Sequence, residues 1–290
     1  MNIDTPLVSV LIPSYNHQSF VIKCIQGVLN QSYRNIELII IDDGSTDSSP
    51  QLINEFNSSL QSKFKFISQS NIGLPKTINY FLTLVTGKYF CLCASDDFWV
   101  ENKIELQVKY MESFSFKMCF GKVIPVDLFG NILNNDLNSK LKGGWIFNDL
   151  MLMKFHPPVN YMYLTETVLS LGGFDEEIHT EDYYMNLKIA EKYEIGFIDE
   201  YLSYYRLHSY KNSQIVKQYI SHLKSINHFK NSDIYSKALM NWHWNSMAVY
   251  TQFIGFKMQG LISLFKHAPS FYKLHYIKSI FKLLFIWRKI

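Results

Sequence analysis

The chain has 290 residues, of which 48% are hydrophobic and 16% aromatic, and its formal net charge is +3. This length suffices for one large domain, or for one domain with an appendage. The polar first residues argue against a signal peptide, and no run of 18 uncharged apolar residues predicts a membrane-spanning helix, so we expect a cytoplasmic protein.

The net charge conceals an uneven distribution along the chain. Residues 211–290 carry twelve of the 28 basic residues and only one of the 25 acidic residues, Asp233. That segment has a formal charge of +11 and the remainder has −8. Such an asymmetry favours an anionic partner for residues 211–290.

The first 125 residues alternate between strand and helix patterns. The run "IELIII" is typical of a strand buried on both faces. Strands are predicted at residues 7–13, 36–41, 64–67, 88–93 and 118–126. Helices are predicted between them, at residues 17–31, after the turn "DDGSTD", and at 74–85 and 101–113. This alternation predicts an α/β fold with a Rossmann-like, mainly parallel central sheet flanked by helices.

The remainder of the chain is less regular at first and then helical. Residues 126–180 contain several Gly and Pro pairs and predict loops and short elements. A helix is predicted at 181–193 and a strand at 195–199. We expect one domain over residues 1–210, followed by a basic, aromatic-rich helical extension over 211–290.

Three polar clusters follow predicted strands: "PSYN", "DDGSTD" and "SDD". Ligands of parallel α/β sheets bind beyond the carboxyl ends of the strands, so these clusters should converge on one edge. Asp96 and Asp97 are adjacent and repel each other, which predicts a divalent cation there, with Mg²⁺ or Mn²⁺ favoured by oxygen ligands. The alternative is that Asp96 caps the helix that follows.

A second acidic pair, Asp42 and Asp43, also follows a buried strand. A carboxylate there would accept a hydrogen bond from a nucleotide base or a ribose hydroxyl. The alternative is a turn stabilised by bonds from the Asp side chains to the backbone. The four cysteines lack the spacing of a metal site and are interpreted as small buried hydrophobic residues.

Six segments of the chain resemble family 2 glycosyltransferases and occur in that family's order over residues 7–210. They are "VSVLIPSYN", "IELIIIDDGSTD", "NIGLPKTIN", "ASDDFW", "GGFDEEIHTEDYYMNLKIA" and "YYRLH". The resemblance implies a GT-A fold, a nucleotide-diphosphate sugar donor, and an inverting reaction with Mn²⁺ or Mg²⁺. It divides the domain into a nucleotide-sugar half, about 1–125, and an acceptor half, about 126–210.

The resemblance also implies the site residues. The nucleotide sugar would be bound by Pro13, Tyr15, Asn16, Asp42, Asp43, Asn71, Gly73, Asn79, Asp96 and Arg206. The metal would be held by Asp96, Asp97 and His208, with the direct ligand among the two aspartates left open. Asp182 matches the catalytic base that a sugar hydroxyl needs, and Glu181 would orient the acceptor. Taken alone, these two acids are also what a helix N-terminus favours.

The chain departs from the family pattern at four positions. Ala94 replaces the first acid of a longer acidic motif, Lys188 stands where Arg is common, and Lys76 and Thr77 replace an Ala-Arg pair. We interpret these as changes of specificity. Aromatic residues are candidates for stacking on a sugar, or equally for core packing: Trp145, Tyr161 and Tyr163.

The sequence therefore predicts a glycosyltransferase that builds a bacterial surface glycan, such as O-antigen or capsule, on a glycan or lipid-linked saccharide acceptor. UDP-hexose is the expected donor, with dTDP-rhamnose as an alternative. Residues 211–290 would place the enzyme on the anionic inner face of the cytoplasmic membrane, or else pack on the domain or in a dimer. No nucleic-acid motif accompanies the charge. A sugar nucleotidyltransferase and a non-catalytic adaptor are the rival interpretations.

Overall fold

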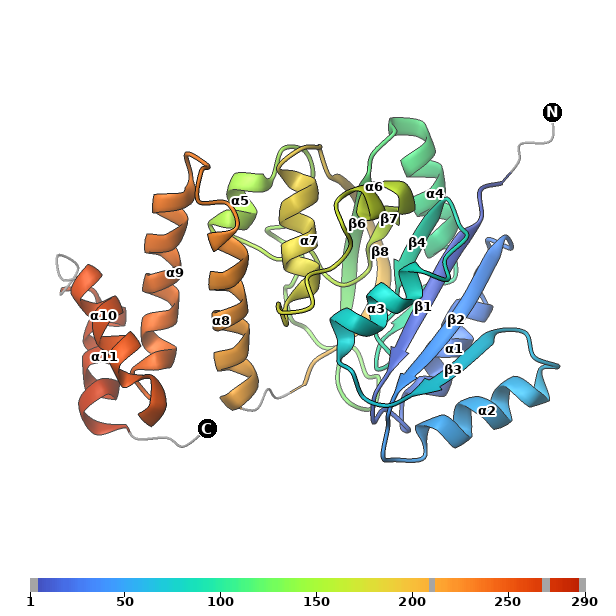
Figure 1. Cartoon of the computed structure of the whole chain (residues 1–290), viewed down its shortest axis with the longest axis horizontal. Helices are drawn as coiled ribbons and strands as arrows, with labels where there is room; N and C mark the ends of the chain where they lie inside the picture. Colours follow the sequence, from blue (N-terminus) through green and yellow to red (C-terminus); the bar gives the residue numbers. More distant parts are fainter. Residues whose placement is uncertain (1–4, 209–211, 268–271, 287–290) are drawn as a thin grey trace. The chain divides into compact units, whose positions relative to one another are not determined.

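The computed structural model describes residues 5–208, 212–267 and 272–286 (Figure 1). The chain divides into two compact units. The first consists of Met1–Ile146, His156–Glu177 and Lys188–His208. The second consists of Phe147–Phe155, Ile178–Leu187 and Ser209–Ile290. The expected division into a domain over residues 1–210 and an extension over 211–290 stays a prediction.

The described part of the first unit contains an eight-stranded sheet in the order β3-β2-β1-β4-β7-β6-β8-β5. Its strands are β1 (Val8–Ser14), β2 (Ile36–Asp43), β3 (Lys65–Gln69), β4 (Tyr89–Leu92), β5 (Phe98–Trp99), β6 (Met118–Val126), β7 (Met162–Leu164) and β8 (Gly196–Arg206). Strands β1 to β4 pair in parallel, as do β6 and β8. Strand β7 runs antiparallel to β4 and β6, and β5 runs antiparallel to β8. The predicted α/β class and mainly parallel sheet are confirmed.

Four helices connect these strands where the sequence predicts them, with shorter bounds: α1 (Val21–Leu29), α2 (Ser49–Ser59), α3 (Leu74–Leu82) and α4 (Lys103–Phe114). Helix α6 (Thr165–Ser170) lies in the segment for which only loops and short elements are predicted. Helix α1 shows the cause most clearly, because its buried residues Val21, Cys24, Ile25 and Val28 recur at helical spacing. Helix α3 begins with Pro75 in its first turn, a position where proline's missing N–H has no helical partner to lose.

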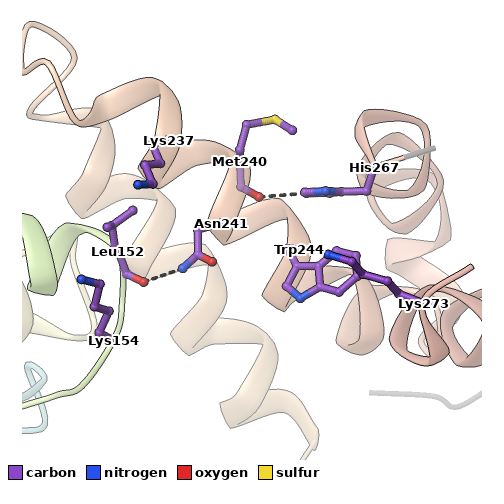
Figure 2. Close-up of a pocket in the computed structure, with 8 residues that line it drawn as sticks. All are labelled: Leu152, Lys154, Lys237, Met240, Asn241, Trp244, His267 and Lys273. Atoms are coloured by element: carbon purple, nitrogen blue, oxygen red, sulfur yellow. Dashed lines mark hydrogen bonds between the residues drawn. The ribbon is translucent and has the colours of Figure 1, made fainter. Parts of the chain in front are cut away.

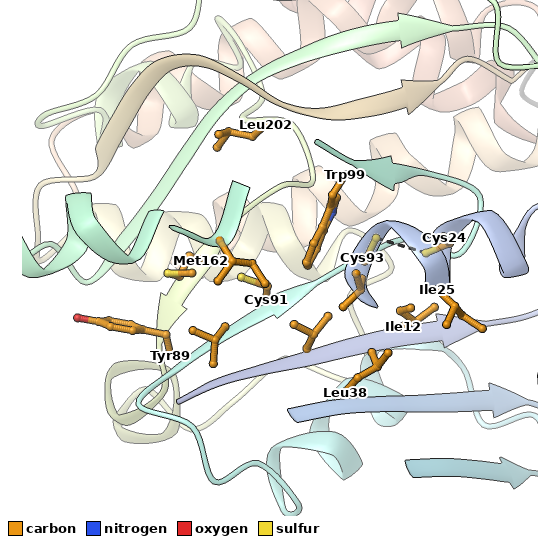
Figure 3. Close-up of a cluster of buried hydrophobic side chains, with 14 of the residues drawn as sticks. Ile12, Cys24, Ile25, Leu38, Tyr89, Cys91, Cys93, Trp99, Met162 and Leu202 are labelled. Atoms are coloured by element: carbon orange, nitrogen blue, oxygen red, sulfur yellow. Dashed lines mark hydrogen bonds between the residues drawn. The ribbon is translucent and has the colours of Figure 1, made fainter. Parts of the chain in front are cut away.

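A core cluster of the first unit lies between the sheet and helices α1 and α4 (Figure 3). Val8, Val10 and Ile12 of the central strand β1 are fully buried. All four cysteines are buried and unbridged, as predicted, and the Sγ atoms of Cys24 and Cys93 lie 3.3 Å apart. This core holds the carboxyl ends of β1, β2 and β4 next to one another, which positions the polar clusters.

The second unit is helical in its described part. It contains α5 (Phe147–Met151), the first seven residues of α7 (Glu181–Ala190), α8 (Asn212–Asn227), α9 (Tyr235–Tyr250), η1 (Ile254–Phe256), α10 (Lys257–Lys266) and α11 (Leu274–Phe285). The predicted helical extension is confirmed there, although residues 211, 268–271 and 287–290 of it lie outside the described residues. Within the described ranges, every helix is too short or too polar to cross a lipid bilayer.

Candidate functional site

The three polar clusters meet at one edge of the sheet, as predicted. Asn16 follows β1 with φ of 55°, and its N–H donates to Oγ of Ser45 at 2.9 Å. Its Oδ1 accepts the N–H of Thr46 at 2.8 Å. Nδ1 of His17 lies 2.7 Å from Oγ of Ser95, which links the end of β1 to the "SDD" cluster. The Asn16 side chain therefore stabilises the neighbouring turn.

The two aspartates that end β2 have different partners. Asp42 is buried and bonds only within its own turn, accepting from Oγ of Ser45 at 2.6 Å and from the Ser45 N–H at 2.9 Å. Asp43 instead holds the segment before α3, because it accepts the N–H groups of Ile72 and Gly73, both at 2.9 Å. A third bond, from Nε2 of Gln69, completes its contacts at 2.9 Å. The alternative interpretation, a stabilised turn, thus describes Asp42, and both aspartates order the backbone around the site.

The segment "NIGLPKTIN" contains an exposed asparagine, Asn71, and a second asparagine, Asn79, that binds the backbone of another segment. Asn71 is exposed beside Gly73, whose φ of 90° is in a region that favours glycine. Asn79 lies one turn further into α3 and pairs with the backbone of Phe174, donating to its carbonyl at 2.8 Å and accepting its N–H at 2.9 Å. Gly173 leaves room for this contact, since a Cβ there would stand 2.9 Å from Oδ1 of Asn79. Asn79 therefore ties α3 to the loop after α6.

Asp96 and Asp97 differ in exposure and in their partners. Oδ2 of Asp96 lies 2.8 Å from Nε2 of His208, and these two side chains are 19% and 33% exposed. Asp97 is buried, and its Oδ1 accepts the N–H of Arg206 at 2.7 Å. Burial, together with the neighbouring charge of Asp96, raises the pKa of Asp97 well above its usual range. Asp96 and His208 are therefore the pair that a ligand can reach.

The donor set at this position fits a divalent cation bound together with a substrate. Among the described residues, no group of three or more His, Cys, Asp or Glu side chains could hold a metal ion by itself. Mg²⁺ and related ions need only one or two protein ligands when substrate phosphates and waters supply the others. The Asp96 carboxylate and the His208 imidazole, both partly exposed, meet that requirement.

Arg206 ends β8 with its side chain buried. Its Nε donates to the carbonyl of Asp96 at 2.7 Å, and its Nη1 donates to the carbonyls of Asp127 and Leu128 at 2.7 and 2.8 Å. The guanidinium carbon lies 4.5 Å from the ring centroid of Phe20. These contacts join the end of β4 to the loop after β6, which is a positioning role. Direct contact of Arg206 with a diphosphate stays a prediction.

Two residues of the site were not singled out from the sequence. The ring of Phe20 packs edge-on against His208, with centroids 6.3 Å apart, in addition to its contact with Arg206. His17 makes the bond to Ser95 described above. The available signal was their place directly after "PSYN", because residues that follow a strand's carboxyl end lie at the same edge as the ligand.

The predicted catalytic pair begins helix α7 in the second unit. Oδ1 of Asp182 accepts the N–H of Tyr183 at 2.8 Å, and the Asp182 side chain is half-buried. Glu181 is buried, and burial followed by the charge of Asp182 raises its pKa well above the usual range. Burial therefore favours the neutral, protonated form of the Glu181 carboxyl over its charged form.

The aromatic candidates separate into surface and core residues. Trp145 is 65% exposed, and Tyr15 next to Asn16 is also exposed. Tyr161 and Tyr163 are buried, and the ring of Tyr163 stacks on Phe90 with centroids 5.1 Å apart. Of the two alternatives, core packing therefore describes Tyr163, which lies in β7, and Tyr161, which directly precedes that strand. Pro13, the remaining predicted residue, lies in β1 opposite Ile41 and is half-buried.

Comparison with known sequences finds relatives that are themselves glycosyltransferases by name. Chondroitin synthase of Escherichia coli is 29% identical over 78% of this chain and 32% of its own length. An uncharacterised glycosyltransferase of Haemophilus influenzae is 37% identical over 47% of this chain and 54% of its own. The chain thus spans a third to a half of these relatives. One from Methanocaldococcus jannaschii is 27% identical over 85% of this chain and 88% of its own length.

Solved structures share the fold. TarS of S. aureus, solved in complex with UDP-GlcNAc, superposes with a TM-score of 0.66 at 16% identity, over 89% of this chain and 79% of that chain. The mannosyltransferase PcManGT of Pyrobaculum calidifontis, solved with GDP-Man and Mn²⁺, gives a TM-score of 0.65 at 14% identity, over 97% and 87% of the two chains. The fold is accordingly the GT-A fold that the sequence predicts. The family model for glycosyl transferase family 2 matches residues 9–156, and the chain belongs to that family.

Proposed function

We propose that the chain transfers a sugar, with inversion, from a nucleotide-diphosphate donor to a hydroxyl of a glycan or lipid-linked saccharide. The observation that carries the proposal is the partly exposed Asp96–His208 pair, which stands beyond the end of β4 beside the polar ends of β1 and β2. A nucleotide sugar is also what TarS and PcManGT were solved with. UDP-hexose is the proposed donor, and dTDP-rhamnose is the alternative.

In the proposed donor site, the exposed residues contact the donor and the buried residues hold the backbone of the site in place. Tyr15, after β1, offers a ring for the nucleotide base, and Asn71, exposed in the connection after β3, offers an amide. Asp43 supports that connection through its two backbone bonds. Arg206 fixes the backbone of Asp96 by donating a hydrogen bond from Nε to its carbonyl. A site held rigidly in this way binds a donor with little loss of side-chain entropy.

A Mn²⁺ or Mg²⁺ ion would be held by Asp96 and His208 and would neutralise the charge that develops on the departing nucleoside diphosphate. Asp97 acts on the geometry instead, because its Oδ1 fixes the backbone of Arg206 two residues before His208. This assignment makes Asp96 the direct ligand of the two aspartates.

Asp182 is the proposed base that accepts the proton of the acceptor hydroxyl. It stands at the first turn of α7, and its partial exposure lets a hydroxyl approach. Glu181 beside it is buried and favours its protonated form, so it would act as a hydrogen-bond donor that keeps the pair from carrying two charges. Attack from the face opposite the leaving group inverts the anomeric carbon.

The experiment that tests the proposal is calorimetric binding of UDP, dTDP and GDP to the full chain, with and without Mn²⁺. Metal-dependent binding of one nucleotide, lost in Asp96→Asn and kept in Asp182→Asn, is the expected result. Asp182→Asn should at the same time abolish sugar transfer. Unchanged turnover in Asp182→Asn would contradict the assigned base, and binding of no nucleotide would favour the adaptor interpretation.

We further propose that the second unit binds an anionic membrane surface, which would bring the enzyme to a lipid-linked acceptor of a surface glycan. Large apolar side chains are exposed on two basic helices: Met258, Ile262 and Phe265 of α10, and Leu274, Ile277, Phe281, Leu284 and Phe285 of α11. Exposed apolar residues in such number mark interaction surfaces, and the charge of +11 over residues 211–290 suits anionic lipid.

Flotation with vesicles tests this surface. Phe285→Ser, at a position that is 67% exposed, should reduce recovery with phosphatidylglycerol vesicles. Phe114→Ser in α4, at a position 62% exposed, is the matched control and should not. Equal recovery of both variants and the wild type would contradict the proposed membrane contact.

A further inference from the structure

The second unit contains a cavity of about 430 Å³ that the donor chemistry does not use (Figure 2). Its volume lies within the range of roughly 300–1,000 Å³ typical of small-molecule sites. The lining comes from α9, the residue after α10, the residue before α11 and the segment after α5: Leu152, Lys154, Lys237, Met240, Asn241, Trp244, His267 and Lys273. The cavity thus combines two apolar side chains with one indole, one amide, one imidazole and three ammonium groups.

The cavity is lined by more positively charged side chains than the carboxylates that form ion pairs with them. Nζ of Lys154 lies 2.6 Å from a carboxylate oxygen of Asp149. Across the described residues, no carboxylate forms an ion pair with Lys237 or Lys273. This side of the second unit therefore carries uncompensated positive charge, which an anion would neutralise.

Several donors of the cavity are held in place before any ligand binds. Nε2 of His267 donates to the carbonyl of Met240 at 2.9 Å, which fixes the imidazole in the lining. Nζ of Lys273 stands 5.3 Å from the ring centroid of Trp244, and the His267 ring packs against the same indole at 5.1 Å. Asn241 is fixed by its bond to the carbonyl of Leu152. Donors held in this way lose little entropy when a ligand arrives.

We propose that this cavity binds the phosphate or diphosphate group of an organic ester. A phosphate offers three oxygens and nearly two charges to several lysines, whereas a carboxylate offers two oxygens and one charge. The remaining volume and the side chains of Leu152 and Met240 accommodate the organic part. The ester is either a soluble sugar phosphate or the headgroup of a lipid-linked saccharide. The proposal goes beyond the glycosyl transfer argued above and does not rest on it.

Calorimetry on the full chain tests this site with three probes: pyrophosphate, glucose 1-phosphate and geranyl diphosphate. EDTA removes divalent metal and so suppresses metal-dependent binding at the donor site. Constant ionic strength keeps the electrostatic screening equal for the three probes. The variant Lys237→Gln with Lys273→Gln should weaken binding at least tenfold. Its matched control, Lys217→Gln with Lys230→Gln, removes the same charge from exposed lysines outside the cavity and should change the affinity less than twofold.

A second variant separates the cavity from the general charge of the unit. Met240→Trp adds bulk at a partly exposed position of the lining and leaves the charge unchanged, so it should also weaken binding. Tighter binding of geranyl diphosphate than of pyrophosphate supports a lipid source, and tighter binding of glucose 1-phosphate supports a soluble one. Equal weakening in both lysine variants, or no binding of any probe at millimolar concentration, would overturn the proposal. Sugar transfer is not measured, so a failure of the donor assignment leaves this result interpretable.

Discussion

The two aspartates that end β2 should respond very differently to the same substitution. In Asp43→Asn, the amide retains one acceptor oxygen for the backbone N–H groups of Ile72 and Gly73, which both lie 2.9 Å from separate carboxylate oxygens. Either orientation of the amide sets its own N–H₂ against one of these donors. Loss of one charge-assisted bond to a part-buried backbone N–H costs about 1.5–3 kcal/mol of unfolding free energy.

Asp42→Asn is the matched control, one residue earlier in the same strand. Its oxygen can keep the N–H of Ser45, and its N–H₂ can donate to Oγ of Ser45, because a hydroxyl accepts as well as donates. The cost should stay below about 1 kcal/mol. Equilibrium urea unfolding followed by circular dichroism measures both values. A difference between the two variants of less than about 0.5 kcal/mol would refute the assignment of Asp43 as the support of the segment before α3.

Three further substitutions test other parts of the site. His208→Ala removes the imidazole 2.8 Å from Asp96 and should weaken Mn²⁺-dependent nucleotide binding about tenfold or more in calorimetry, with metal-free binding unchanged. Because the pKa of Glu181 is raised on folding, the wild type loses stability as the pH rises from the unfolded-state pKa of about 4 through the raised value. Glu181→Gln should remove that loss and exceed the wild type in urea unfolding at pH 7; an identical pH profile would contradict the shift. Gly73→Ala should cost about 1–3 kcal/mol through its φ of 90° alone, since no atom lies within 4 Å of the added Cβ; an unchanged urea midpoint would contradict that cost.

The parallel part of the sheet could be predicted because its elements carry local signals. Buried strands such as Ile36–Asp43 are continuous apolar runs, and α1 repeats its apolar residues at helical spacing. Strands β5 and β7 could not be predicted in this way. They have two and three residues, too few to show a period, and they are defined by pairing with strands far away in the sequence. Strand β8 extends to Arg206, well past the predicted 195–199, because β6 supplies a long partner.

The residues of the site could be named from motifs, but their contacts could not. Nothing in "YYRLH" indicates that Arg206 donates to three backbone carbonyls, since those carbonyls come from segments up to 110 residues away. The same holds for the second unit, in which residues 147–155 and 178–187 join the C-terminal helices. Such groupings arise from long-range packing, which no local pattern encodes.

The residues of the motifs differ in whether their polar atoms are already bonded within the chain. Asp42, Asp43 and Asp97 are buried and bonded to their own chain, so a ligand that displaced those bonds would have to replace every one of them. The side chains of Asp96 and His208 are partly exposed, and a cation or phosphate can replace the polar contact between them at little cost. Recognition of the donor should accordingly depend on the few exposed groups, whereas the buried aspartates should govern the stability of the loops that present them. Substitutions of the exposed groups should therefore change the affinity for the donor, and substitutions of the buried aspartates should change the unfolding free energy.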